Sequence, residues 1–198
     1  MAGVGFTRAE LESFRDREVP DLLPGPGRPL RLLFVGINPG LWTAATGTHF
    51  ARPGNRFYPA LLRAGIIERR IDPAAGMTDD DREHLRARGL GITNVARRAT
   101  AQAAELGVEE LRAGGAALTA LVARERPTVV AVAGVTAYRT AFGQRRAAPG
   151  RQPGRWGDSV VWVVPNPSGL NAHETVETLA AAYAEPARAA GVIGRPPG

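Results

Sequence analysis

The sequence predicts an α/β fold, a three-layer α/β/α sandwich with a central four-stranded parallel sheet. Four short apolar runs have the composition of strands buried on both faces, at residues 32–35, 90–95, 128–133 and 160–164. Segments with helical periodicity separate these runs, so strand and helix alternate along the chain. That alternation is typical of a parallel sheet covered by helices on both faces.

The chain has 198 residues, enough for one domain with a sizeable core, and no internal repeat or long linker divides it. We therefore expect a single domain over residues 1–198. Within it, residues 1–29 form an N-terminal helix and a connector rich in proline and glycine. Residues 30–190 form the core, and residues 191–198 form a frayed tail.

The composition indicates a polyanionic partner, because the formal net charge is +6 and the sequence pI is about 11.0. Nucleic acid is the commonest partner of such proteins. Every basic residue is arginine, which excludes a P-loop lysine and a lysine Schiff base. The absence of cysteine excludes disulfides, a thiolate nucleophile and cysteine-ligated iron–sulfur clusters. Without a long apolar stretch or a signal-peptide pattern, we expect a soluble, cytoplasmic protein with no membrane segment.

Local signals indicate where the helices begin. Thr7 and Glu10 form a capping-box pattern that starts a short helix in residues 7–16. The acidic run at residues 79–83 is interpreted as the first turn of another helix rather than a metal site, because carboxylates there complement the helix dipole. Further helices are predicted at residues 56–64, with Leu62 on the apolar side, at 108–124, around 138–142 and at 174–190.

The first strand ends in a stiff turn, Gly36-Ile37-Asn38-Pro39-Gly40. Its two glycines permit close approach of the backbone to a ligand, and Pro39 biases Asn38 toward an extended conformation. Open α/β sheets bind ligands outside the carboxyl ends of their strands, which is where this turn lies. Asn38 is therefore the first candidate for a catalytic residue, although asparagine, proline and glycine are also common turn residues in general.

Two other strands end in polar turns, Thr93-Asn94 and Pro165-Asn166-Pro167-Ser168-Gly169-Leu170. The second of these turns is again built from asparagine, proline and glycine. By the strand-end rule we expect both turns to lie beside the first, at one ligand crevice. The three histidines, His49, His84 and His173, are far apart in sequence and do not have metal-ligand spacing, so no metal site is predicted.

Residues 143–158 are predicted to form a long mobile loop that carries four arginines and Trp156. Arginines interleaved with an aromatic residue suit contact with phosphates or with single-stranded or distorted DNA. The alternative is a solvated loop that reflects the arginine-rich composition of the chain. The arginines are Arg145, Arg146, Arg151 and Arg155.

Four motifs follow one another along the chain: GINPG at residues 36–40, FARPGNRF at 50–57, GITN at 91–94 and NPSGL at 166–170. In this order and spacing they resemble the motifs of the mismatch-specific uracil/thymine DNA glycosylases, a branch of the uracil-DNA glycosylase superfamily. The resemblance covers about residues 30–190. It implies the fold of that superfamily, a four-stranded parallel sheet between helices.

The resemblance also implies roles for the residues that would hold the target base. Asn38 would position the attacking water. The backbone at Ile37 and Phe50 would hydrogen-bond the flipped base, and the Phe50 ring would stack on it. Asn94 would add a side-chain contact to the base, and Asn166 would line the site.

The last motif implies contacts with the DNA itself. Asn166 and Ser168 would grip the phosphate, and Gly169 and Leu170 would form the wedge that fills the gap left by the extruded nucleotide. Apolar wedges replace lost stacking in other DNA-distorting proteins. The alternative is that Leu170 belongs to the apolar core.

The implied activity is hydrolysis of the N-glycosidic bond of uracil in mismatched DNA, for base excision repair, with thymine and other damaged bases as further candidates. An amide has no useful basicity, so Asn38 can orient water but cannot take its proton, which predicts a slow enzyme. Without a lysine to form a Schiff base, the enzyme is expected to be monofunctional and to leave an abasic site in an uncut strand.

The expected partner is double-stranded DNA that contains mismatched or damaged bases, bound by a nucleoid-associated monomer without cofactor or metal. Two alternatives remain open at this point. A non-catalytic binder of mismatched or abasic DNA would share the wedge and the arginines. A flavodoxin-like enzyme acting on a small nucleotide would share the sheet, but it leaves the basic charge unexplained.

Overall fold

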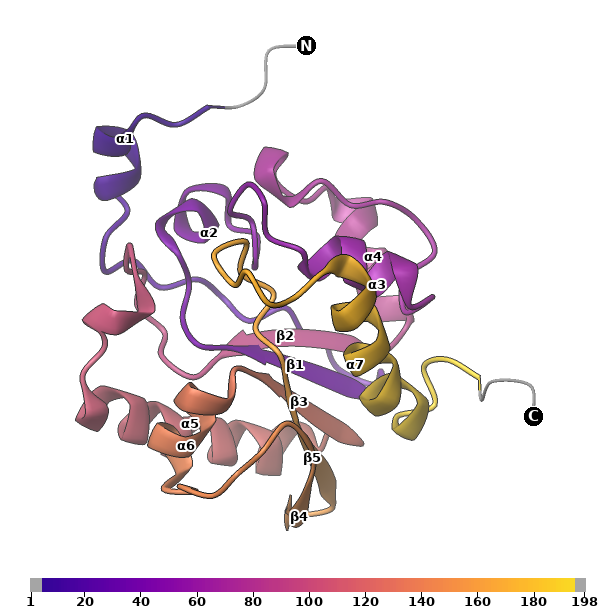
Figure 1. Ribbon diagram of the computed structural model, residues 1–198. Helices are drawn as coiled ribbons and strands as arrows, with labels where there is room; N and C mark the ends of the chain where they lie inside the picture. Colours follow the sequence, from indigo (N-terminus) through magenta and orange to yellow (C-terminus); the bar gives the residue numbers. More distant parts are fainter. Residues whose placement is uncertain (1–4, 195–198) are drawn as a thin grey trace.

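The computed structural model of the protein describes residues 5–194. In them one sheet has the strand order β2-β1-β3-β5-β4 (Figure 1). The four predicted strands are present and mutually parallel, which confirms the predicted fold class. They are β1 (Leu32–Gly36), β2 (Leu90–Asn94), β3 (Val129–Ala133) and β5 (Ser159–Val164).

A fifth strand, β4 (Gly150–Trp156), extends the sheet at one edge and pairs antiparallel with β5. It lies within the segment 143–158, so the prediction of a long mobile loop is wrong for these residues. Most side chains of β4 are exposed, which is why no apolar run indicated a strand. Trp156 does not stand free, because its ring packs against Phe142 with the centroids 4.5 Å apart.

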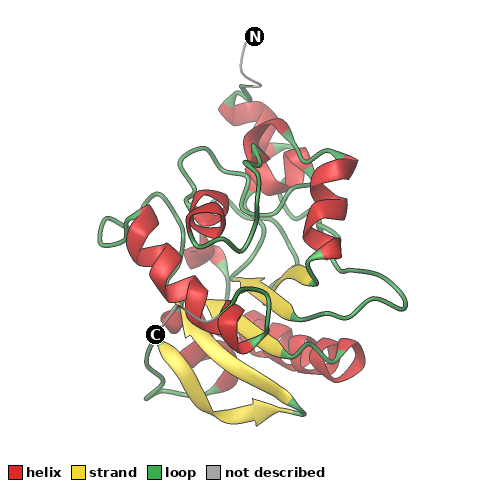
Figure 2. Cartoon of the chain, turned by 90° about the vertical axis from the view of Figure 1, so that its right-hand side faces the viewer, coloured by secondary structure: helices red, strands yellow, loops and turns green. Residues whose placement is uncertain are grey.

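Helices cover both faces of the sheet (Figure 2). Alternate residues of β1 point into two separate apolar clusters. Leu32 and Phe34 pack against one group of helices, α3 (Phe57–Arg63), α4 (Asp79–Ala87) and α7 (Val176–Ala189). Leu33 and Val35 pack against the other group, α5 (Val108–Glu125) and α6 (Val135–Phe142). The three-layer α/β/α arrangement is thus confirmed.

The predicted helix starts are largely confirmed. Thr7 caps α1 (Arg8–Glu12), and Thr78 with Asp81 forms a capping box at α4, where the acidic run lies. Three details differ. α1 is shorter than predicted, and α2 (Leu41–Thr46) was not predicted because no side chain caps it. Leu62 on α3 is 38% exposed, so its assignment to the apolar side is wrong.

The order of the strands creates a crevice at the carboxyl edge of the sheet. The chain leaves β1 toward β2 on one side, whereas it leaves β3 toward β5 on the other. The connections after these two adjacent strands therefore diverge, and such a switch point is where open α/β sheets bind ligands. Among residues 5–194, no helix is both long and apolar enough to cross a membrane. The last part of the predicted tail, residues 195–198, lies outside the described residues.

Candidate active site

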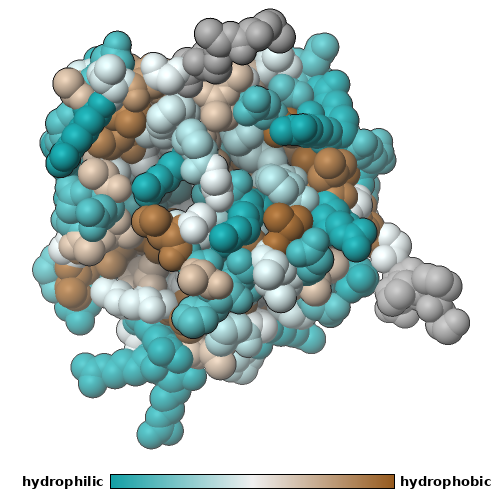
Figure 3. All heavy atoms as spheres, turned by 45° about the horizontal axis from the view of Figure 1, so that its top comes forward, coloured by the Kyte–Doolittle hydropathy of each residue, from teal (hydrophilic) through white to brown (hydrophobic). Residues whose placement is uncertain are grey.

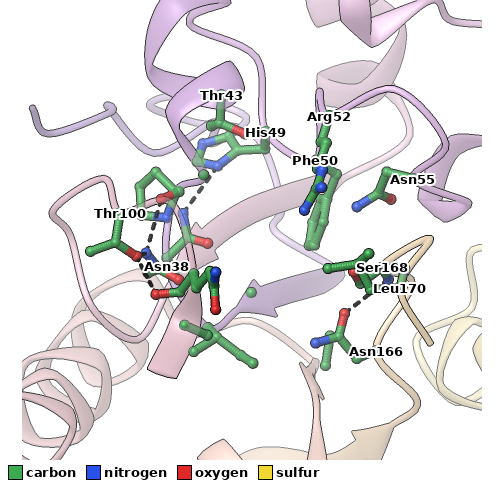
Figure 4. A pocket seen from close by; sticks show the side chains of 18 of the residues that line it. Asn38, Thr43, His49, Phe50, Arg52, Asn55, Thr100, Asn166, Ser168 and Leu170 are labelled. Atoms are coloured by element: carbon green, nitrogen blue, oxygen red, sulfur yellow. Dashed lines mark hydrogen bonds between the residues drawn. The ribbon is translucent and has the colours of Figure 1, made fainter. Parts of the chain in front are cut away.

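A cavity of about 330 Å³ lies at this carboxyl edge. All four parallel strands contribute to its wall, since Gly36, Asn94, Ala133 and Asn166 lie at or just after their ends. The structure brings the predicted site residues together here, with Gly169 as the exception (Figure 4). Those that line the cavity are Ile37, Asn38, Phe50, Asn94, Asn166, Ser168 and Leu170.

The side-chain amide of Asn38 is held in one orientation. Its Nδ2 donates to the Thr100 hydroxyl at 2.7 Å and to the Pro39 carbonyl oxygen at 2.9 Å. A carbonyl oxygen only accepts hydrogen bonds, so Nδ2 and Oδ1 cannot exchange places. The Thr100 hydroxyl in turn donates to the Gln102 carbonyl at 2.8 Å. Within residues 5–194 no group donates to Asn38 Oδ1, which leaves this oxygen to accept from a water in the cavity.

Asn94 is oriented in a similar way by His49. The His49 Nε2 lies 3.0 Å from the Pro20 carbonyl oxygen, and the Asn94 Nδ2 lies 3.2 Å from the His49 Nδ1. His49 is 4% exposed, and this burial lowers its pKa below the ordinary histidine value. His49 is therefore neutral near pH 7.

Phe50 has a left-handed backbone, with φ of 57°, which is uncommon for a bulky residue and typical of functional sites. Several contacts hold this segment. The buried Tyr58 hydroxyl donates to the His49 carbonyl at 3.0 Å. One face of the Phe50 ring stacks on Phe57 with the centroids 4.0 Å apart, while Phe50 also lines the cavity. The ring is thus already positioned as a stacking surface for a flat ligand.

Asn166 begins the second asparagine-proline turn. Its Oδ1 accepts from the Ser168 backbone N–H at 3.0 Å, so its NH₂ group is the part left to donate. The turn is held from outside by Arg56, whose Nη1 donates to the Asn171 carbonyl at 3.0 Å. The Tyr183 hydroxyl donates to the Pro165 carbonyl at 3.0 Å. Arg56 is the N-cap residue of α3 and Tyr183 lies on α7, so two helices outside the turn hold it in place.

Leu170 is 73% exposed at the mouth of the cavity, so the alternative that it belongs to the core is wrong. Gly169 does not reach the cavity. It packs instead against the loop before α3, where a Cβ on Gly169 would lie 2.6 Å from the Gly54 carbonyl oxygen. Large exposed apolar residues are few: with Leu170, the described chain exposes Leu62 and Val108. On the face drawn in Figure 3 the apolar surface is likewise broken into small separate areas.

The cavity has apolar and polar lining residues, but no acid is among the described ones. None of the described residues that line it is an aspartate or glutamate, and its ionisable side chains are those of His49 and Arg52. No group of three or more metal-ligating side chains occurs in residues 5–194. The cavity can therefore orient water and accept or donate hydrogen bonds, but it has no carboxylate that could act as a general base.

Three contributing residues were not assigned roles from the sequence. Thr100 orients Asn38, His49 orients Asn94, and Arg56 holds the second turn. Thr100 follows a strand-end turn, so its position near the crevice could have been foreseen. The contacts of His49 and Arg56 connect segments that are 45 and 115 residues apart, and no local pattern indicates them.

Comparison with known proteins gives two findings. Residues 25–186 match the family model described as the uracil DNA glycosylase superfamily. The fold is also similar to the solution NMR structure of a candidate uracil DNA glycosylase from Methanosarcina acetivorans, with a TM-score of 0.60. That match covers 89% of this chain and 98% of the other, at 16% sequence identity, and it is a likeness of fold.

Proposed function

Because this chain belongs to the uracil DNA glycosylase superfamily and is a DNA glycosylase, we propose that its substrate is uracil in mismatched duplex DNA. The proposed reaction is hydrolysis of the N-glycosidic bond, which releases the free base and leaves an abasic site. The enzyme acts as a monomer in this proposal, with thymine opposite guanine as a second, slower substrate.

The observation that carries the proposal is the fixed amide of Asn38. Its NH₂ group is occupied by Thr100 and Pro39, and its Oδ1 has no donor among the described residues. An amide oxygen held in this way accepts a hydrogen bond from one water and orients its lone pair toward the sugar. Since no carboxylate lines the cavity, the water attacks only as the bond to the base breaks and positive charge develops on the sugar.

The departing base carries negative charge, so hydrogen-bond donors around it lower the barrier. Two donors of the cavity wall are available for this purpose. The Asn166 NH₂ group is left free when its Oδ1 accepts from Ser168. The Phe50 backbone N–H has no acceptor within residues 5–194. Stabilisation of the leaving group by such donors, without acid–base catalysis, is consistent with a slow glycosylase.

Preference for mismatches follows from the cost of base flipping. Chemistry on a base within a duplex requires its extrusion, which costs a few kcal/mol and costs least where pairing is already weak. The exposed side chain of Leu170 beside the cavity is suited to fill the gap in the base stack. A uracil opposite guanine should therefore be released faster than a uracil opposite adenine.

The test is a strand-cleavage assay on end-labelled duplexes that carry G·U, G·T or A·U at one position. We expect cleavage of G·U after alkali and none without alkali, because the chain contains no lysine that could cut the strand through a Schiff base. G·T and A·U should react more slowly. If no duplex is cleaved while abasic DNA is still bound, the protein is a non-catalytic binder and the proposal is wrong.

A further inference from the structure

We propose that His49 is a positioning residue that fixes the Asn94 amide, so that the cavity selects bases with a ring N–H beside a carbonyl group. This inference rests on the proposed function and adds to it the residue that orients the base-contacting amide. Uracil and thymine have such an edge. Cytosine presents the reverse pattern, a ring nitrogen that accepts beside an amino group that donates.

The orientation follows from a chain of three groups. The Pro20 carbonyl can only accept, so the His49 Nε2 at 3.0 Å must carry a hydrogen. A neutral imidazole with a hydrogen on Nε2 has an acceptor at Nδ1. The neighbour at 3.2 Å must therefore be a donor, which is the NH₂ group of Asn94. The burial that keeps His49 neutral also keeps this assignment in place.

The other end of the amide supports the same orientation. Asn94 Oδ1 occupies the space that a side chain at residue 36 would need, so any Cβ there would overlap it. These two residues are register partners at the ends of β2 and β1, and both line the cavity. No group within residues 5–194 donates to this oxygen. The cavity thus presents an acceptor at Asn94 Oδ1, held by His49 on one side and accommodated by Gly36 on the other.

A fixed acceptor discriminates by hydrogen bonding. The N3–H of uracil or thymine can donate to Asn94 Oδ1, and the second hydrogen of Asn94 Nδ2 can donate to the adjacent carbonyl O4. Cytosine would place its N3 lone pair against Oδ1, and two acceptors repel. Reversal of the amide would accommodate cytosine, but it would set the Asn94 oxygen against the Nδ1 lone pair of His49. The cost of leaving buried polar groups unpaired is what excludes the wrong base.

The first test measures single-turnover excision of uracil and of cytosine, each placed opposite thymine so that both are mispaired. His49→Gln can keep the contact with Pro20 but has no acceptor at the Nδ1 position. We expect it to lower the uracil-to-cytosine rate ratio by about tenfold, the effect of one lost buried partner. His49→Asn places an amide oxygen near the Nδ1 position and should restore part of the ratio. His84→Gln, a histidine outside the cavity, is the matched control and should leave the ratio unchanged.

A second measurement is independent of activity. The imidazole ¹⁵N shifts of the wild-type protein at pH 7.5 should show His49 with a protonated Nε2 and an unprotonated Nδ1, assigned by comparison with His49→Gln. A protonated Nδ1 would overturn the inference, as would an unchanged rate ratio in His49→Gln. If the wild type releases no uracil, the proposed function fails and base selection by His49 fails with it. Even then, the ¹⁵N shifts still show whether Nδ1 of His49 is an acceptor that can orient the Asn94 amide.

Discussion

Asn38, Asn94 and Asn166 each present an amide to the cavity, and in each case a neighbouring group decides which end faces inward. Thr100 and Pro39 bind the amino group of Asn38, and His49 binds that of Asn94, so the oxygens of both side chains stay free. In Asn166 the Ser168 N–H binds the oxygen, so the amino group stays free. The site therefore has defined donors and acceptors without any carboxylate. In the proposed reaction such a site would recognise a base by its hydrogen-bonding pattern, and the attack on the sugar would be made by an oriented water.

The buried state of His49 makes a prediction about stability. Burial lowers the pKa of His49, and burial together with Arg69 and Arg88 lowers that of His84. The unfolded chain binds protons at these residues near pH 6.5, whereas the folded chain does so only at lower pH. The free energy of unfolding should therefore fall as the pH drops below 6.5, for His49 by at most about 1.4 kcal/mol per pH unit.

Denaturant unfolding between pH 5.5 and 7.5 measures this slope. His49→Gln should make the free energy of unfolding less dependent on pH, whatever its effect on stability at pH 7.5. His173→Gln, the same change at an exposed position, controls for the substitution itself. An identical slope in His49→Gln and wild type would show that His49 is not held neutral in the folded protein.

At the scale of single elements, the loop after β5 combines a rigid base with an exposed tip. Arg56 and Tyr183 donate hydrogen bonds to the carbonyl groups of Asn171 and Pro165, so the loop is fixed at both ends. Gly169 packs closely against Gly54, where no larger residue fits without a shift of the backbone. Leu170 lies between these anchors and remains exposed. A held loop with a free apolar tip is suited to enter a base stack.

Leu170→Ala should therefore affect duplex substrates selectively. The side chain is 73% exposed, so the free energy of unfolding should change by less than about 0.5 kcal/mol. Excision from a G·U duplex should fall by about tenfold, because the gap left by the flipped base is no longer filled. Excision from single-stranded uracil DNA should be unchanged, since no such gap exists there.

Val108→Ala is the matched control, because Val108 is another exposed apolar residue, at the start of α5 and outside the cavity. It should alter neither substrate. Equal losses on single-stranded and duplex DNA in Leu170→Ala would contradict the wedge and place Leu170 among the residues that contact the base itself.

The elements also show why some structure was predictable and some was not. The buried parallel strands have uninterrupted apolar runs, and two asparagine-proline turns mark where β1 and β5 end, so the edge that bears the site followed from local patterns. β4 has exposed polar side chains and Pro153, and it becomes a strand only through pairing with β5. The same reason applies to the contacts of His49 and Arg56, which depend on tertiary packing.

At the scale of the whole molecule, binding and selection are carried by different features. The net charge is +6, and arginine is the only basic residue type apart from histidine. Such a charge attracts any duplex, and the strength of this attraction depends on the salt concentration rather than on the DNA sequence. The cavity at the switch point between β1 and β3 is small and uncharged apart from Arg52, because His49 is neutral. In the proposed function the charge therefore brings the protein to DNA, and the cavity selects the base that reacts.

In the proposed reaction, Asn38 orients the water that attacks the sugar. The most direct measurement is the single-turnover rate of uracil release from a G·U duplex by Asn38→Ala, with binding to abasic DNA measured in parallel. We predict a rate at least about 100-fold lower with binding nearly unchanged, because the oriented water contributes only when the bond breaks. Gln144→Ala, which removes an exposed amide outside the cavity, should match the wild type. A rate for Asn38→Ala within about threefold of wild type would contradict the account.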